Sequence, residues 1–146
     1  MALIVEVGNS RIKAALFPSQ HPPEVLLLRD PTELEAWTSS SVAFLDTRND
    51  PIWRAALERL GAQELTVAQG LPFRSEYSSQ LGPDRAAQLV AAWEAGGFPA
   101  LVISLGTACV LDYLDKDGVH RGGVITSGLH LRVYGPSTTE QAACLS

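Results

Sequence analysis

Cysteine is scarce in this sequence of 146 residues, and the two cysteines present are far apart. Cys109 and Cys144 form no C-x-x-C motif, so neither a disulfide framework nor a zinc site is expected. No stretch approaches the roughly 18 apolar residues that a membrane span needs. The short apolar start has no basic region before it, so we interpret it as a first strand and not as a signal peptide. We therefore expect a cytoplasmic protein with no membrane partner.

Clustered positive charge is also absent. The 11 lysines and arginines are scattered among 16 acidic residues, and the formal net charge is −5. General nucleic-acid binders need gathered basic residues to displace counterions, so nucleic acid is not an expected partner. The content of 46% hydrophobic and 18% charged residues is typical of a globular domain.

Two groups of β-type segments are separated by helical segments. Apolar runs predict strands over residues 2–7, 11–17, 24–28, 41–45 and 64–67, and again over 100–105, 109–114 and 119–126. Helices are expected over 32–37, 51–60 and 83–95, with Gly61 ending the second of them. Segment 4–9 (IVEVGN) and segment 102–107 (VISLGT) both run from a strand into a polar turn with glycine, which indicates an internal duplication.

The turn after the first strand has the composition of a phosphate-binding hairpin. Gly8 and Asn9 tolerate positive φ, so we expect their backbone N–H groups to face phosphate oxygens. Ser10 adds a hydroxyl and Lys13 a cation. Taken alone, the same residues also fit a plain tight turn with a solvated lysine.

Asp84 and Arg85 open the helix predicted over 83–95, directly after Gly82. An acid in this position is commonly a helix-start residue stabilised by the helix dipole. A carboxylate within reach of a hydroxyl is also the usual general base of phosphoryl transfer to an alcohol.

Asp112 is interpreted as a strand-end acid, while His21, His120 and His130 share no spacing and are expected at the surface. Trp37, Trp53 and Trp93 are expected in the core or an interface.

Four segments, 5–13, 82–85, 103–108 and 122–129, together resemble the type III pantothenate kinase family. Segment 5–13 (VEVGNSRIK) resembles the opening D-x-G-N-[ST]-x-x-K motif, and segment 82–85 (GPDR) resembles G-x-D-R. Segments 103–108 (ISLGTA) and 122–129 (GGVITSGL) resemble D-x-G-T-A and G-G-x-I-x-P-G-L. The resemblance covers about residues 1–130. It implies an α/β actin-like (ribonuclease H-like) duplicated fold, a mixed sheet with flanking helices, with a first lobe over 1–97 and a second over 98–146.

The resemblance also implies a reaction and roles for residues. The family transfers phosphate from ATP to pantothenate, giving 4′-phosphopantothenate in the first step of coenzyme A biosynthesis, with Mg²⁺ and a monovalent cation (K⁺ or NH₄⁺). By resemblance Asp84 is the general base. The implied substrate-binding residues are Gly82, Pro83, Asp84, Arg85 and Tyr77. The implied nucleotide-binding residues are Glu6, Val7, Gly8, Asn9, Ser10, Arg11, Ile12, Lys13 and Thr107.

Four departures from the family pattern leave alternatives open. Tyr77 lies closer to segment 82–85 than the family's substrate tyrosine does. Glu6 replaces an aspartate associated with the metal, and Ser104 replaces the acid at the monovalent-cation position, so we expect that site to be weakened or lost. The chain ends about twenty residues after Gly123, so we expect an incomplete second lobe that hides its apolar strands in a homodimer. A catalytically degenerate binding or regulatory module is therefore the alternative function. Another actin-like enzyme, such as a sugar or acetate kinase, is disfavoured by segment 82–85.

Overall fold

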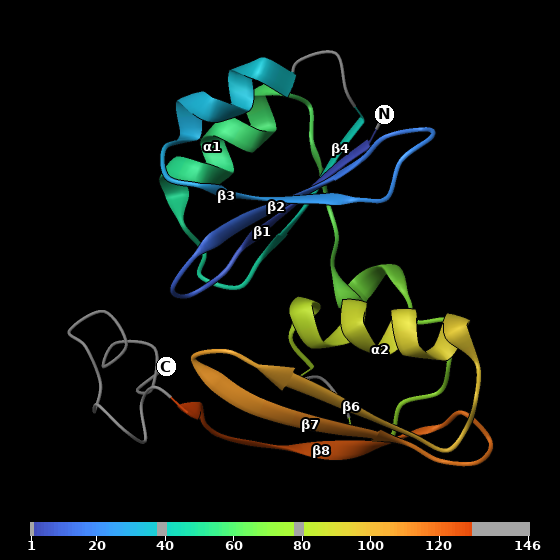
Figure 1. The fold of residues 1–146 in the computed structure, drawn as a ribbon. Coiled ribbons are helices and arrows are strands. Elements are labelled where there is room, and N and C mark those ends of the chain that lie inside the picture. The colour runs from blue at the N-terminus through green and yellow to red at the C-terminus, as the bar shows by residue number, and fades with distance from the viewer. Residues whose placement is uncertain (1, 38–40, 78–80, 130–146) are drawn as a thin grey trace. The chain divides into compact units, whose positions relative to one another are not determined.

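Two compact units make up the chain. The structure, a computed structural model, describes residues 2–37, 41–77 and 81–129. Its contacts divide it into a first unit, Met1–Thr66, and a second unit, Val67–Ser146. Each unit has its own sheet and its own hydrophobic core, and the two sheets share no strand (Figure 1).

The first unit is built on a five-stranded mixed sheet. Strands β1 (Ala2–Val7), β2 (Ile12–Phe17) and β3 (Glu24–Leu28) form an antiparallel meander. Strand β4 (Ser41–Asp46) then runs parallel to β1, and the short strand β5 (Gln63–Glu64) runs parallel to β4. The resulting order is β3-β2-β1-β4-β5. Because β1 is central and alternate side chains point to opposite faces, it buries Leu3, Val5 and Val7 completely.

Two helices lie together on one face of this sheet (Figure 1): the 3₁₀ helix η1 (Pro31–Trp37) and the α-helix α1 (Pro51–Arg59). Asp50 caps α1, since its Oδ1 accepts the backbone N–H groups of Ile52 and Trp53 at 3.0 and 3.1 Å. Trp53 is buried in the core with Phe44 of β4. The predicted helix start and the core placement of Trp53 are confirmed.

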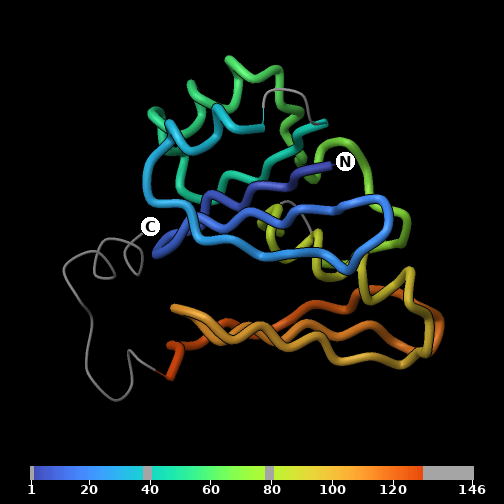
Figure 2. The backbone as a smooth tube through the Cα atoms, turned by 45° about the horizontal axis from the view of Figure 1, so that its top comes forward, coloured from blue at the N-terminus to red at the C-terminus, as the bar shows by residue number. Residues whose placement is uncertain are grey.

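The second unit contains the 3₁₀ turn η2 (Val67–Gln69), the helix α2 (Pro83–Ala95) and a three-stranded antiparallel sheet. Strands β6 (Ala100–Leu105), β7 (Ala108–Leu114) and β8 (His120–Ser127) lie side by side along their length (Figure 2). Helix α2 packs against β6, with Leu89 and Leu114 at the centre of the core. The β6–β7–β8 meander repeats the β1–β2–β3 meander, as the internal duplication predicts.

The fold class is confirmed as a mixed α/β arrangement with a five-stranded sheet and covering helices. The strand predicted over 64–67 is shorter than expected, because the chain turns into η2 at Val67, where it leaves the first unit. The units also divide before the predicted lobe boundary at residue 97, because α2 shares the core of β6 and β7. The division of the family's two lobes at 97 and 98 stays a prediction. No helix in the described residues is long and apolar enough to cross a membrane.

Candidate functional site

The β1–β2 hairpin carries the predicted nucleotide-binding residues of the first unit. Glu6 and Lys13 are direct partners across the two strands, and Lys13 Nζ lies 3.1 Å from Glu6 Oε2. Both side chains remain partly exposed, so water screens the pair and it contributes little to stability. The hairpin therefore carries the predicted Lys13 cation. The Glu6 carboxylate beside it competes with any bound anion for the lysine ammonium group.

The conformation of the turn differs from the prediction. Neither Gly8 nor Asn9 has positive φ. The Gly8 N–H donates to the carbonyl oxygen of Arg11 at 3.2 Å and so closes the hairpin, whereas the sequence predicts that it faces phosphate. Glycine is needed at position 8 for space, because a Cβ there would lie 2.9 Å from the Arg11 oxygen.

The other hairpin residues divide into core and surface. Val7 and Ile12 are buried in the core of the first unit, and the Val7 carbonyl oxygen accepts hydrogen bonds from the N–H and hydroxyl of Thr47. The tip of the hairpin, Asn9, Ser10 and Arg11, is exposed. Any contact that residues 7 and 12 make with a nucleotide is therefore limited to their backbone.

Helix α2 begins with the residues predicted to bind substrate. Gly82 is the N-cap, Pro83 occupies the first helical position, and Asp84 lies in the first turn. A Cβ on Gly82 would lie 2.8 Å from Asp84 Oδ1, so the carboxylate bends back over the helix start. That position brings a negative charge next to the unpaired N–H groups of the first turn, which is favourable.

Arg85 points the other way, into the second unit, because successive residues of a helix are about 100° apart. Its Nε and Nη2 donate to Asp112 Oδ2 and Oδ1 of β7 at 3.0 and 2.6 Å. Both side chains are almost fully buried, at 6% and 4% exposure. A two-bond contact of this kind fixes the plane of the guanidinium as well as its position.

His120 and Ser75 continue this buried network. His120 Nε2 lies 3.0 Å from Asp112 Oδ1, and a carboxylate only accepts, so this nitrogen carries the proton. His120 Nδ1 lies 2.8 Å from Ser75 Oγ, which also lies 3.0 Å from the Tyr77 carbonyl oxygen. Burial alone raises the pKa of Asp112, but the hydrogen bonds from Arg85 and His120 outweigh it and hold that pKa below its ordinary value.

Two expectations are corrected by this network. Asp112 is a buried ion-pair partner in the interior of β7, not a strand-end acid. His120 is fully buried, not a surface residue, because its ring is held at both nitrogens and lies against Phe73 and Tyr77. The usable signal was the acid at position 112 inside an apolar run, since a buried carboxylate requires a partner.

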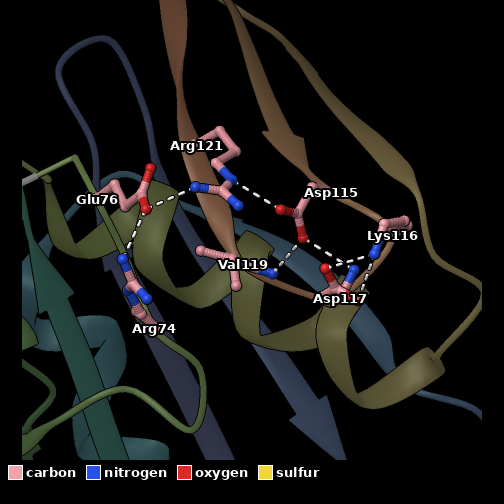
Figure 3. Close-up of polar contacts among 7 residues, drawn as sticks. All are labelled: Arg74, Glu76, Asp115, Lys116, Asp117, Val119 and Arg121. Carbon is pink, nitrogen blue, oxygen red and sulfur yellow. Dashed lines mark hydrogen bonds and ion pairs between the residues drawn. The ribbon is translucent and has the colours of Figure 1, made fainter.

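The segment before α2 is held against β8. Ser75 forms an isolated parallel bridge with His120, in which the His120 N–H donates to the Arg74 oxygen and the Glu76 N–H donates to the His120 oxygen. Figure 3 shows a second connection at the surface, where Arg121 of β8 lies between Glu76 and Asp115 at 2.6 and 2.7 Å. These contacts place the Tyr77 ring under the Arg85 guanidinium, at 4.9 Å from ring centre to Cζ. The structure therefore brings two of the predicted substrate residues together.

The paired glycines of β8 provide the space for these side chains. A Cβ on Gly123 would overlap the Leu111 carbonyl oxygen and the Asp112 carboxylate. Gly122 has φ +120°, and a Cβ there would lie 3.2 Å from the Tyr77 ring. Gly122 and Gly123, the first two residues of segment 122–129, thus leave room for the Tyr77 ring and the Asp112 carboxylate.

The β6–β7 turn carries Thr107 and follows Ser104. Gly106 N–H donates to the Ala108 oxygen, and Gly128 N–H donates to the Thr107 oxygen, each at 2.9 Å. The Ser104 hydroxyl accepts a hydrogen bond from the Gln88 side-chain amide at 3.3 Å. Ser104 and Gln88 bring no carboxylate, so they do not fit a monovalent-cation site of the acid-based kind. Within residues 2–37, 41–77 and 81–129, no group of three or more His, Cys, Asp or Glu side chains could hold a metal ion.

The duplicated meander, the two glycine turns and the α2 start define a protein of the actin-like α/β class. Comparison with known proteins gives the family: the model described as type III pantothenate kinase matches residues 2–135. The chain therefore belongs to the type III pantothenate kinase family.

Individual relatives carry the same description. A type III pantothenate kinase of Azoarcus sp. is 49% identical over 149 residues, which cover 90% of this chain and 56% of the relative. Those of Phocaeicola vulgatus and Moorella thermoacetica are 33% and 36% identical, covering 90% and 88% of this chain and 60% and 61% of the relatives. The chain thus spans about three fifths of the length of these relatives.

Proposed function

We propose that this chain takes part in the ATP-dependent phosphorylation of pantothenate to 4′-phosphopantothenate, the reaction that begins coenzyme A biosynthesis. The observation that carries the proposal is the arrangement in the second unit, where Asp84 and Arg85 lie in the first turn of α2 and the Arg85 guanidinium lies over the Tyr77 ring, within a family-matched segment. In this proposal Gly82 and Pro83 shape the helix start, while Arg85 and Tyr77 hold the substrate.

Asp84 is the proposed general base. In the reaction the pantothenate hydroxyl oxygen bonds to the γ-phosphorus, the bond from that phosphorus to the ADP oxygen breaks, and the hydroxyl proton passes to an Asp84 carboxylate oxygen. A half-buried carboxylate with no ion pair among the described residues is able to accept that proton. General-base catalysis of this kind is worth about 10²–10⁴-fold in rate.

The two glycine turns are the proposed nucleotide contacts. Lys13 supplies a cation for phosphate, the exposed hairpin tip supplies polar groups, and Thr107 lies in the matching turn of the second unit. Mg²⁺–ATP supplies the phosphoryl group when bound, and Glu6 is the hairpin carboxylate that could face the metal ion. A monovalent cation is not part of this proposal, because Ser104 and Gln88 do not fit one.

The test is ADP release by the full chain with and without pantothenate. Asp84→Asn keeps size and shape but cannot accept the proton, so turnover should fall by about 10²–10⁴-fold while ATP binding survives. Lys13→Ala should instead weaken ATP binding through the lost phosphate contact. Asp117→Asn is the matched control, since Asp117 is an exposed acid of the β7–β8 turn. Wild-type turnover by Asp84→Asn would contradict the assignment of the base.

A binding or regulatory module is the second candidate. It is favoured by the Lys13–Glu6 pair, which occupies the cation of the hairpin, and by Ser104 in place of an acid. In this case the wild-type chain binds ATP in titration calorimetry but releases no ADP with pantothenate.

A further inference from the structure

Of the hydrogen-bonded network Arg85–Asp112–His120–Ser75, the proposed reaction uses only Arg85. Its three ionisable members come from α2, β7 and β8, and all of them are buried. Burying charged and polar groups away from water is costly unless each of them is hydrogen-bonded. The hydrogen bonds of this network therefore fix the positions of its side chains.

We propose that Asp112 and His120 are positioning residues that hold the Arg85 guanidinium and the Tyr77 ring in the orientation in which they meet the substrate. The proposal rests on the proposed function for the roles of Arg85 and Tyr77. The placement of the Arg85 guanidinium and the Tyr77 ring rests on hydrogen bonds and ring contacts in the structure, and does not depend on the proposed function.

The contacts with Asp112 determine which end of the Arg85 guanidinium is left to face the substrate. Nε and Nη2 both face Asp112, so the Nη1 end of the guanidinium is directed away from it. His120 Nε2–H donates to the same oxygen, Oδ1, that accepts from Arg85 Nη2. Asp112 is therefore held from two sides, and its carboxylate cannot rotate without breaking one of these bonds.

His120 also orders the segment that carries Tyr77. Its backbone N–H and oxygen bond to Arg74 and Glu76, and its Nδ1 contacts the Ser75 hydroxyl, which reaches the Tyr77 carbonyl oxygen. The imidazole lies against the Tyr77 ring, with centroids 5.9 Å apart. One residue thus connects Asp112, and through it Arg85, with the backbone of Tyr77.

Two variants of His120 separate its contacts. Glutamine places its amide near the Nε2 position and keeps a donor to Asp112, while asparagine reaches only the Nδ1 position and keeps the contact to Ser75. In His120→Asn we expect the pantothenate KM to rise about tenfold with little change in the KM for ATP. His120→Gln should restore most of the affinity. A role confined to folding would not give this split, and thermal melting checks that each variant folds.

A readout without substrate tests the geometry itself. In nitrogen-15 NMR of the full chain, the Arg85 Nε–H signal should exchange slowly in wild type and His120→Gln, and rapidly in His120→Asn. Ser75→Ala, a smaller change, should leave the Arg85 signal intact and raise the pantothenate KM through Tyr77. Should both His120 variants fail to fold, the serine variant still tests the connection to Tyr77.

The outcomes are distinguishable. An unchanged Arg85 signal together with unchanged pantothenate KM in His120→Asn overturns the positioning role and leaves the proposed function standing. No turnover by wild type, combined with the expected loss of the Arg85 signal, overturns the proposed function and leaves the positioning of Arg85 standing. A Ser75→Ala chain with wild-type pantothenate KM overturns the connection to Tyr77.

Discussion

Arg85 and Asp112 place two charges inside the second unit, where water cannot screen them. Removing such ions from water costs several kcal/mol each, and the paired hydrogen bonds offset that cost only while both partners are present. The exposed Lys13–Glu6 pair is different, because either member alone is well solvated. Single substitutions in the buried network should therefore be far more damaging than those in the hairpin pair.

Gly123 gives a residue-scale prediction. In Gly123→Ala the new methyl group overlaps the Leu111 oxygen and the Asp112 carboxylate, so the sheet or the ion pair must shift. We expect the free energy of unfolding to fall by about 1–3 kcal/mol, the usual cost of overpacking. Urea unfolding followed by circular dichroism measures this.

Gly106→Ala is the control for that experiment. A Cβ at position 106 meets its nearest neighbour, the Ala108 oxygen, at 3.8 Å, which is ordinary contact. Its stability should stay close to that of wild type. Equal losses in the two variants would show that close packing at Gly123 is not the cause.

At the scale of elements, strong local signals predicted the structure well. Residues 83–95 and 100–105 form the helix and strand predicted for them, because proline opens the helix, glycines end it, and the strand is apolar except at Ser104. Segment 73–77 could not be predicted in the same way, since its order comes from the bridge to His120 and not from its own sequence. The burial of His120 was missed for the same reason: its partners are brought together only by the sheet register.

The N-cap of α1 gives a prediction on pH. The Trp53 N–H, the Arg48 side chain and the Ile52 N–H hold the pKa of Asp50 below its ordinary value, against the effect of burial. Because the folded pKa is lower than the unfolded one, this contribution is present above the unfolded value of about 3.9 and is lost as pH falls through the folded value. Asp50→Ala should cost about 0.5–2 kcal/mol at pH 7, and the deficit should shrink at pH 3.

Asp50→Ser is the matched variant, because its hydroxyl accepts a cap hydrogen bond but does not titrate in this range. We expect it to keep most of the stability at pH 7 and to show a flatter dependence on pH than wild type. Urea titrations at the two pH values compare all three chains. A deficit in Asp50→Ala that is as large at pH 3 as at pH 7 would argue against the carboxylate as the cap.

At the scale of the whole molecule, one face of the second sheet has no cover among the described residues. The β6 side chains that point away from α2 are apolar and exposed: Leu101, Ile103 and Leu105. Tyr113 and Val124 lie on the neighbouring strands of the same face and are also exposed. An apolar surface of this kind favours association. We therefore propose that the chain forms a homodimer or a larger assembly.

Light scattering tests this at tens of micromolar. Ile103→Lys places a charge in the middle of the exposed face and should shift the population toward monomer. Val25→Lys is the control, since Val25 is equally apolar and exposed but lies on β3 of the first unit. A wild-type chain that is monomeric at this concentration would refute the proposal.

The division of the chain after Thr66 has a consequence for its synthesis on the ribosome. Every strand of the first sheet is synthesised before α2, so this unit can begin to fold while the rest of the chain is still being translated. Arg85, in contrast, emerges well before Asp112 and His120, and it must stay solvated until the β7–β8 hairpin is complete. A nascent chain arrested between α2 and β7 would thus contain every strand of the first sheet and Arg85 of α2, but not the Asp112 carboxylate with which Arg85 pairs.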